Sequence, residues 1–92
     1  MAVYLICYDI SDDRLRDEVS RVLQEYGNRV QRSVFEVALR GEAEREGLRA
    51  RLREVLGETP ELRFYRLCER CRADSWDLNG APLAVFPRTI IL

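Results

Sequence analysis

The sequence predicts an α+β fold in which two helices cover one face of an antiparallel sheet. Three observations lead to this fold class. An apolar run near the amino terminus has the length and composition of a strand, two segments place apolar residues at helical spacing, and the segments that follow each helix have strand composition. With 92 residues, the chain is long enough for one domain with a modest core.

The first predicted strand is the apolar run Val3–Ile10, VYLICYDI. It opens with six consecutive apolar residues, several of them β-branched or aromatic, which predicts a strand buried on both faces. Near its carboxyl end the run is broken by the carboxylate of Asp9. Because α/β sheets tend to bind ligands at that end of a strand, Asp9 is the first candidate for a functional residue. The alternative is that Asp9 only ends the strand or places an anion near the start of a helix.

A helix of about four turns is predicted after this strand. Either Asp12 or Ser11 can serve as its N-cap, and Gly27 is the expected stop. In this interpretation Asp12 and Asp13 cap the helix and do not bind a metal ion. Apolar residues at helical spacing form its buried stripe, namely Leu15, Val19, Val22, Leu23 and Tyr26.

The segment Arg29–Arg40 predicts a hairpin, because β-branched and apolar residues alternate there with polar ones. Since twelve residues is long for one strand, we expect Arg32-Ser33 to turn RVQ back against VFEVAL. One uninterrupted strand is the alternative, because no glycine marks the turn.

A second helix is predicted over Glu42–Leu56, with Gly57 and Pro60 ending it. The segment Leu62–Leu67, LRFYRL, is predicted to be a further strand, and Cys68–Gly80 a loop or short hairpin. The apolar stripe of the second helix consists of Leu48, Leu52, Val55 and Leu56.

The resulting order, βαββαβ, is that of the ferredoxin-like fold, which carries both helices on one face of its sheet. The other face needs a cover, and a homodimer that packs sheet against sheet would supply it. The chain closes with Thr89–Leu92, a β-prone apolar segment that would be a sticky edge if left unpaired. We therefore expect a single domain over residues 1–92, with an additional strand at about 88–92 that pairs with its own sheet or with a partner subunit.

The composition excludes several classes of function. The sequence has no histidine, which rules out Ser-His-Asp and Cys-His catalysis and every metal site that needs histidine. The net charge of −1 gives no global case for nucleic-acid binding. All 15 basic residues are arginine, which binds phosphate bidentately, although genome composition or thermal adaptation explains that preference equally well. With no secretion signal or membrane-spanning run, we expect a soluble cytoplasmic protein that does not bind membranes.

Cys68 and Cys71 form a lone CxxC motif. With no histidine, and with only Cys7 remaining inside the first strand, one chain lacks the four ligands of a structural zinc site. A redox site would place the motif at the start of a helix after the first strand, whereas this pair follows a late strand. We therefore expect reduced thiols, packed or free, in a loop.

Several short motifs occur together in this chain. The strand end Tyr8-Asp9-Ile10 is followed about twenty residues later by VQxSVFE, which is Val30–Glu36 here. Asp13-Arg14, Tyr26-Gly27 and Tyr65–Cys68 accompany them. Taken together, these motifs resemble the small CRISPR-associated endonucleases of spacer acquisition, the Cas-two family. The resemblance spans nearly the whole chain and is weakest over residues 72–87.

This resemblance implies a ferredoxin-like homodimer whose terminal strand crosses to the partner. It also implies metal-dependent hydrolysis of phosphodiester bonds in RNA or DNA, in spacer acquisition and antiviral defence. The two copies of Asp9 would share one Mg²⁺, with Mn²⁺ as the alternative ion, and Tyr8 is the second catalytic candidate. Phe35 and Ser33 would support this site. The resemblance also matches three arginines by position to the site or to nucleic acid, namely Arg14, Arg16 and Arg29.

Arg32 occupies a variable position of the family pattern and is a further candidate for a phosphate contact. A second interpretation makes the protein a non-catalytic dimer that bridges copies of the CRISPR integrase, the large adaptation subunit, and holds duplex DNA on its arginine surface. In that case, binding would survive the loss of Asp9 but fail when Arg14 and Arg16 are replaced by glutamate. A third interpretation, a ferredoxin-like domain that binds a small molecule, has only fold analogy behind it.

Overall fold

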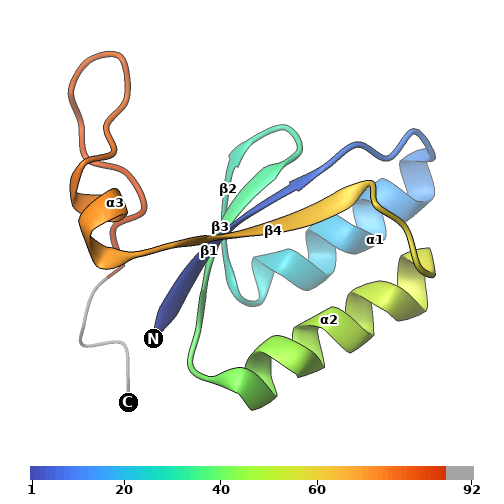
Figure 1. Cartoon of the computed structure of the whole chain (residues 1–92). Coiled ribbons are helices and arrows are strands. Elements are labelled where there is room, and N and C mark those ends of the chain that lie inside the picture. The colour runs from blue at the N-terminus through green and yellow to red at the C-terminus, as the bar shows by residue number, and fades with distance from the viewer. Residues whose placement is uncertain (87–92) are drawn as a thin grey trace.

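The computed structural model describes residues 1–86, and its seven elements form an α+β fold (Figure 1). Four antiparallel strands make one sheet in the order β2-β3-β1-β4. The helices α1 and α2 lie side by side on one face of this sheet (Figure 1). The predicted βαββαβ order is confirmed. The bounds are β1 Ala2–Tyr8, α1 Asp13–Gln24, β2 Gly27–Gln31, β3 Val34–Leu39, α2 Glu42–Leu56, β4 Leu62–Leu67 and α3 Glu69–Ala73.

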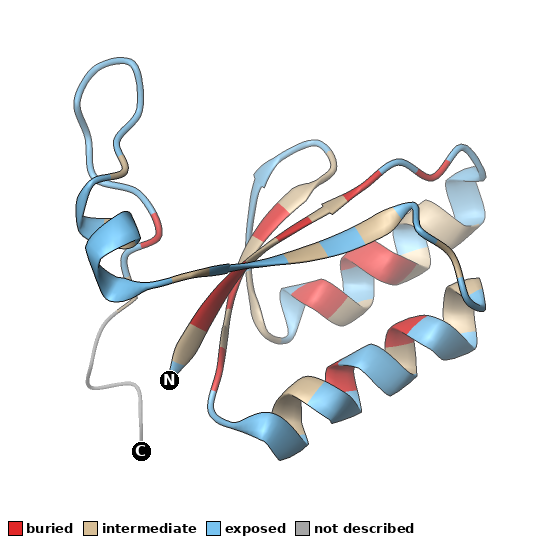
Figure 2. Ribbon diagram, in the orientation of Figure 1, coloured by how far each residue is buried: buried red, intermediate tan, exposed pale blue. Residues whose placement is uncertain are grey.

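The core lies between β1, β3 and the two helices (Figure 2). Side chains alternate along β1, so that Tyr4, Ile6 and Tyr8 are buried beneath the helices. Leu5 and Cys7 point to the helix-free face and are only half-buried. The expectation that this strand is buried on both faces is therefore wrong for these two residues, because the helices α1 and α2 cover only one face of the sheet.

The predicted hairpin is confirmed, with its turn at Arg32-Ser33 between β2 and β3. The role expected for Gly27 is wrong, because α1 ends at Gln24 and Gly27 opens β2 instead. A side chain at Gly27 would place its Cβ 2.0 Å from the carbonyl oxygen of Glu36. Glycine is therefore needed here for the close approach of two strands and not for ending a helix.

Local sequence signals fix both long helices. Asp12 is the N-cap of α1, and its Oδ1 accepts the backbone N–H of Leu15 at 3.0 Å, as the sequence predicts. The helix α2 occupies the predicted residues, and Gly57 follows it as the C-cap. The described residues contain no helix that is long and apolar enough to cross a membrane.

The segment after β4 differs from its prediction as a loop or hairpin. Cys68 is the N-cap of a short helix, α3, because its side chain accepts the backbone N–H of Cys71. A tight turn follows α3 and is closed by a bridge between Trp76 and Pro82. The strand predicted at about 88–92 lies outside the described residues.

Candidate functional site

Asp9 lies at the carboxyl end of the central strand β1 and is exposed to solvent. Its backbone N–H donates to the carbonyl oxygen of Glu61 at 2.9 Å, just before β4 begins. One residue earlier, the N–H of Tyr8 donates to the carbonyl oxygen of Ser33 at 3.1 Å. The backbone of Asp9 is therefore held between two neighbouring segments while its carboxylate faces water.

The antiparallel register gathers most of the predicted site residues at this end of the sheet. The β2–β3 turn, which contains Arg32 and Ser33, lies beside the end of β1 because Cys7 pairs with Val34. The first turn of α1 also begins here (upper right of Figure 1). It carries Arg14, which is exposed. Predicted site residues up to 24 positions from Asp9 in the sequence are thus brought to the same end of the sheet.

Tyr8 points away from Asp9, to the helix side of the sheet. Its side chain is buried and stacks on Phe35, with ring centroids 6.4 Å apart. The Tyr8 hydroxyl has no hydrogen-bond partner among residues 1–86. Burial raises the pKa of Tyr8, and the nearby positive charge of Arg29 opposes that rise. The catalytic role expected of Tyr8 thus falls on a hydroxyl that solvent does not reach.

Arg29 connects β2 to α1. Its guanidinium lies over the ring of Phe35, 5.6 Å from the centroid, and donates to the hydroxyl of Ser20. Ser20 is the buried polar residue of the described core. Ser20 was not among the predicted site residues, although a serine next to Val19 on the apolar side of α1 is a usable signal for a buried hydroxyl with a partner.

The side chain of Arg16 is also engaged in contacts within the chain. Its Nη1 donates to the carbonyl oxygen of Ile10 at 3.0 Å, and its Nη2 pairs with the carboxylate of Asp13. Arg14 and Arg32 are exposed, as Arg29 is, but their side chains form neither an ion pair nor a hydrogen bond with the residues that the structure describes. The four candidate arginines therefore divide into two that brace the fold, Arg16 and Arg29, and two that are available to a ligand.

A divalent ion at Asp9 would need ligands in addition to this carboxylate. No cluster of three or more acidic or cysteine side chains with metal-binding geometry occurs within residues 1–86. Asp12 is engaged as an N-cap and Asp13 in its pair with Arg16. The carboxylate of Asp9 is a hard oxygen ligand of the kind that Mg²⁺ prefers, but Mg²⁺ takes six oxygens. The chain thus fits this ion only where a second carboxylate, substrate oxygens and water complete the set.

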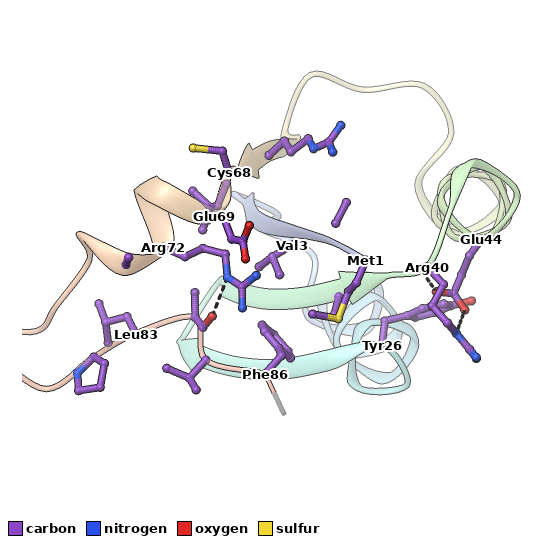
Figure 3. Close-up of a pocket in the computed structure, with 18 of the residues that line it drawn as sticks. Met1, Val3, Tyr26, Arg40, Glu44, Cys68, Glu69, Arg72, Leu83 and Phe86 are labelled. Atoms are coloured by element: carbon purple, nitrogen blue, oxygen red, sulfur yellow. Dashed lines mark hydrogen bonds and ion pairs between the residues drawn. The ribbon is translucent and has the colours of Figure 1, made fainter. Parts of the chain in front are cut away.

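A groove of about 1410 Å³ lies at the opposite end of β1 from Asp9 (Figure 3). It is lined by the start of β1 at Met1 and Val3, by Cys68 and Arg72, and by Phe86. None of the predicted site residues borders it. Its position therefore separates it from the carboxylate end of the sheet.

Comparison with known proteins identifies the family. The family model described as CRISPR associated protein Cas2 matches residues 1–75 of this chain. The chain belongs to the Cas2 family. This match includes Asp9 and both long helices, and it confirms the resemblance drawn from the sequence motifs.

Curated relatives cover most of the chain. A protein of Chloroflexus aurantiacus named CRISPR-associated endoribonuclease Cas2 1 is 46% identical over 81 residues, covering 86% of each chain. A protein of Synechocystis sp. named CRISPR-associated endoribonuclease Cas2 3 is 40% identical over 95 residues, covering 100% of each chain. The chain is thus similar in length, as well as in sequence, to these Cas2 proteins.

Solved structures give the same result for the fold. The Cas2 chain of a partial Cas6-RT-Cas1–Cas2 complex superposes with a TM-score of 0.86 at 38% identity, covering 100% of both chains. Streptococcus pyogenes Cas2 superposes with a TM-score of 0.72 at 28% identity, covering 83% of this chain and 98% of the other. The ferredoxin-like α+β architecture is therefore that of Cas2 proteins.

Proposed function

We propose that this chain is a metal-dependent endonuclease of CRISPR spacer acquisition that hydrolyses phosphodiester bonds of single-stranded RNA as a homodimer. The observation that carries the proposal is the exposed carboxylate of Asp9, whose backbone is fixed at the end of the central strand, at the same end of the sheet as Arg14 and Arg32. RNA is the favoured substrate because the relatives from Chloroflexus and Synechocystis are named endoribonucleases. Duplex DNA is the alternative substrate.

The homodimer would bury the helix-free face of the sheet. Leu5 and Tyr65 are paired across β1 and β4 on this face, and Tyr65 keeps 46% of its surface exposed. A second copy packed against this face would remove that apolar surface from water. It would also bring a second copy of the β1 end into the assembly, which supports a site that one chain does not complete.

The two Asp9 carboxylates of such a dimer would hold the metal ion, Mg²⁺ with Mn²⁺ as the alternative. When bound, this ion supplies Lewis-acid polarisation of the scissile phosphate and a more acidic water nucleophile. The guanidinium groups of Arg14 and Arg32 would bind non-bridging phosphate oxygens and orient the strand. In-line attack by water would leave a 3′-hydroxyl and a 5′-phosphate.

The residues that hold the end of β1 in place would act by positioning. Tyr8, Phe35 and Arg29 form one stacked group, so the end of β1 is held rigidly against the core. Ser33 contributes its carbonyl oxygen to the backbone of Tyr8. Because the Tyr8 hydroxyl is buried, we assign Tyr8 to this support and leave the chemistry to Asp9.

The test is cleavage of end-labelled single-stranded RNA and duplex DNA by the wild-type protein and Asp9→Asn, each with Mg²⁺ and with EDTA. We expect RNA cleavage that requires Mg²⁺ and falls at least about a hundredfold in Asp9→Asn. The matched control is Glu54→Gln, which removes an exposed carboxylate from α2 and should leave the rate unchanged. If Asp9→Asn and the wild type cleave at equal rates, Asp9 is not part of the catalytic site.

A second function, a non-catalytic scaffold, is favoured by one comparison. The neighbour that superposes over the whole chain belongs to a complex that contains Cas1. We infer that this chain can likewise bind the CRISPR integrase and hold duplex DNA between its copies. The scaffold function predicts that Asp9→Asn keeps DNA and integrase binding, while Arg14→Glu weakens DNA binding at least about fivefold. Arg16 is left unaltered here because it braces α1.

A further inference from the structure

The CxxC motif lies at a helix start and not in the predicted loop or short hairpin. Cys68 precedes α3 as its N-cap, and Cys71 lies in the first turn. The Sγ of Cys68 accepts the backbone N–H of Cys71 at 3.3 Å. Both thiols are free and exposed to solvent, whereas Cys7 is half-buried in β1. Two accessible thiols therefore lie next to each other, far along the chain from the nuclease site.

This geometry suits a disulfide bond. Residues three apart on a helix have Cα atoms about 5 Å apart, inside the range that a disulfide spans. The 3.3 Å contact places the Cys68 sulfur at most about 4.8 Å from the Cα of Cys71. The bond can thus form by rotation of the side chains, without moving the backbone of α3.

The two thiols are not equivalent. Hydrogen bonds from the backbone and thiol of Cys71 lower the pKa of Cys68. The same interaction with Cys68 raises the pKa of Cys71. At neutral pH the sulfur of Cys68 is thus the better nucleophile, and Cys71 is placed to attack it in turn.

Next to Cys71, Arg72 holds the last described segment of the chain (Figure 3). Its Nε donates to the carbonyl oxygen of Ala84 at 3.0 Å, and its guanidinium lies over the ring of Phe86. The N–H of Ala84 donates to the carboxylate of Glu36 on β3 at 3.1 Å. Ala84 is buried, with a φ of 51° that is unusual for a residue other than glycine. The short helix α3 thus clamps this segment against the sheet.

We propose that Cys68 and Cys71 form a reversible intrachain disulfide, by exchange with a low-molecular-weight disulfide such as oxidised glutathione, and that this bond tightens the Arg72 clamp on Ala84. The Cys68 thiolate attacks one sulfur of the small disulfide and releases one small thiolate. The Cys71 thiol then loses its proton and attacks the Cys68 sulfur, which releases the second small thiol. Two protein thiols are oxidised and one small disulfide is reduced to two thiols.

The effect on the clamp follows from the size of α3. A helix of five residues is marginal on its own, so α3 opens readily and releases Ala84 when it does. Closing a ring across its first turn removes open conformations from that equilibrium. The oxidised protein therefore holds the segment at residues 84–86 for a larger fraction of the time.

The test equilibrates the reduced protein with glutathione buffers of increasing oxidised fraction, traps free thiols by alkylation and locates the bond by peptide mass spectrometry. We expect an intrachain Cys68–Cys71 disulfide in the wild type and in Cys7→Ser. Cys71→Ser should instead accumulate a mixed disulfide on Cys68, because no second thiol resolves it. In the reduced wild type, peptide mass spectrometry should show Cys71 alkylated at least about tenfold more slowly than Cys68.

Hydrogen exchange at the amide of Ala84 is the second readout. Oxidation should slow this exchange at least about threefold in the wild type and leave Cys71→Ser unchanged. The proposal is overturned if the oxidised wild type carries only mixed or interchain disulfides. It is also overturned if the Cys68–Cys71 bond forms while the exchange of Ala84 stays the same. Neither result depends on whether the protein cleaves nucleic acid.

Discussion

The backbone N–H of Asp9 donates to the carbonyl oxygen of Glu61 at 2.9 Å, so a main-chain hydrogen bond connects the end of β1 to the start of β4. The carboxylate of Asp9 takes no part in this bond and stays in water. The backbone of Asp9 thus fixes where the residue lies, while its side chain stays in water. A change of the side chain leaves the position intact, which makes this residue well suited to mutagenesis.

We therefore expect Asp9→Asn and Asp9→Ala to unfold within about 0.5 kcal/mol of the wild type. Asp9→Pro removes the N–H and should lose about 1–3 kcal/mol, because the carbonyl of Glu61 loses its partner. Urea denaturation followed by circular dichroism measures all three free energies of unfolding. A large loss in Asp9→Asn would mean that the carboxylate itself stabilises the fold.

Arg29 should stabilise the fold as well as contribute charge. Arg29→Ala removes the contact with Phe35 and the hydrogen bond to Ser20, and we expect a loss of about 1–2 kcal/mol. A double-mutant cycle with Ser20→Ala should give a coupling energy above about 0.5 kcal/mol. Urea denaturation of the wild type, the two single variants and the double variant gives the four free energies of unfolding that the cycle requires. Strict additivity of the two single changes would show that the two side chains do not interact in solution.

Two glycines should respond oppositely to alanine. Gly27→Ala forces a Cβ to within 2.0 Å of the carbonyl oxygen of Glu36, so we expect a loss above about 2 kcal/mol. Gly47→Ala is the matched control, because nothing lies within 4 Å of its added Cβ on α2. Its higher helix propensity should add about 0.5–1 kcal/mol. Thermal and urea unfolding of both variants measure these changes in the free energy of unfolding. A Gly27→Ala variant as stable as the wild type would contradict the register of β2 and β3.

The ion pair between Glu25 and Arg51 should make stability depend on pH in the acid range. Both carboxylate oxygens of Glu25 accept from Arg51, at 2.8 Å and 2.9 Å, and these bonds lower the pKa of Glu25 below its usual 4.5. A lowered pKa means that the stabilisation is present at higher pH and disappears as the pH falls through the folded-state value.

The variant Glu25→Gln should therefore melt below the wild type at about pH 7, and this difference should be smaller at about pH 3, where protonation of Glu25 weakens the pair. Thermal melts at both pH values, at low and high salt, measure the effect, and salt should reduce it because the pair is exposed. Glu54→Gln, which removes an exposed carboxylate of α2, provides the control substitution. A constant difference across this range would assign the effect of Glu25→Gln to something other than its charge.

Local patterns in the sequence predicted much of the fold. The helix α2, the strand β4 and the turn at Arg32-Ser33 lie at the predicted residues, and Asp12 is the predicted N-cap. These features depend on side-chain periodicity and on capping groups within a few residues, which the sequence displays directly. The prediction for α3 failed because a five-residue helix is too short to show a period.

The candidate site was predicted less completely. The apolar run before Asp9 predicted that this residue lies at the carboxyl end of a central strand, which the structure confirms, and its exposure was learned from the structure. The burial of Tyr8 depends on which face of β1 the helices cover, and the partnership of Arg29 with Ser20 depends on how β2 packs against α1. Contacts of this kind join distant segments, so no local pattern reports them.

The sequence by itself determined the order of the elements, most of their bounds and the family, because short motifs and the periodicity of apolar side chains indicate each of these. Only the tertiary structure decided that Gly27 serves a close approach of strands, that two of the four candidate arginines brace the fold, and that Cys68 caps a helix whose first turn contains Cys71. The physical reason is that strand register and helix packing assign each side chain its neighbours, and those neighbours come from elsewhere in the chain.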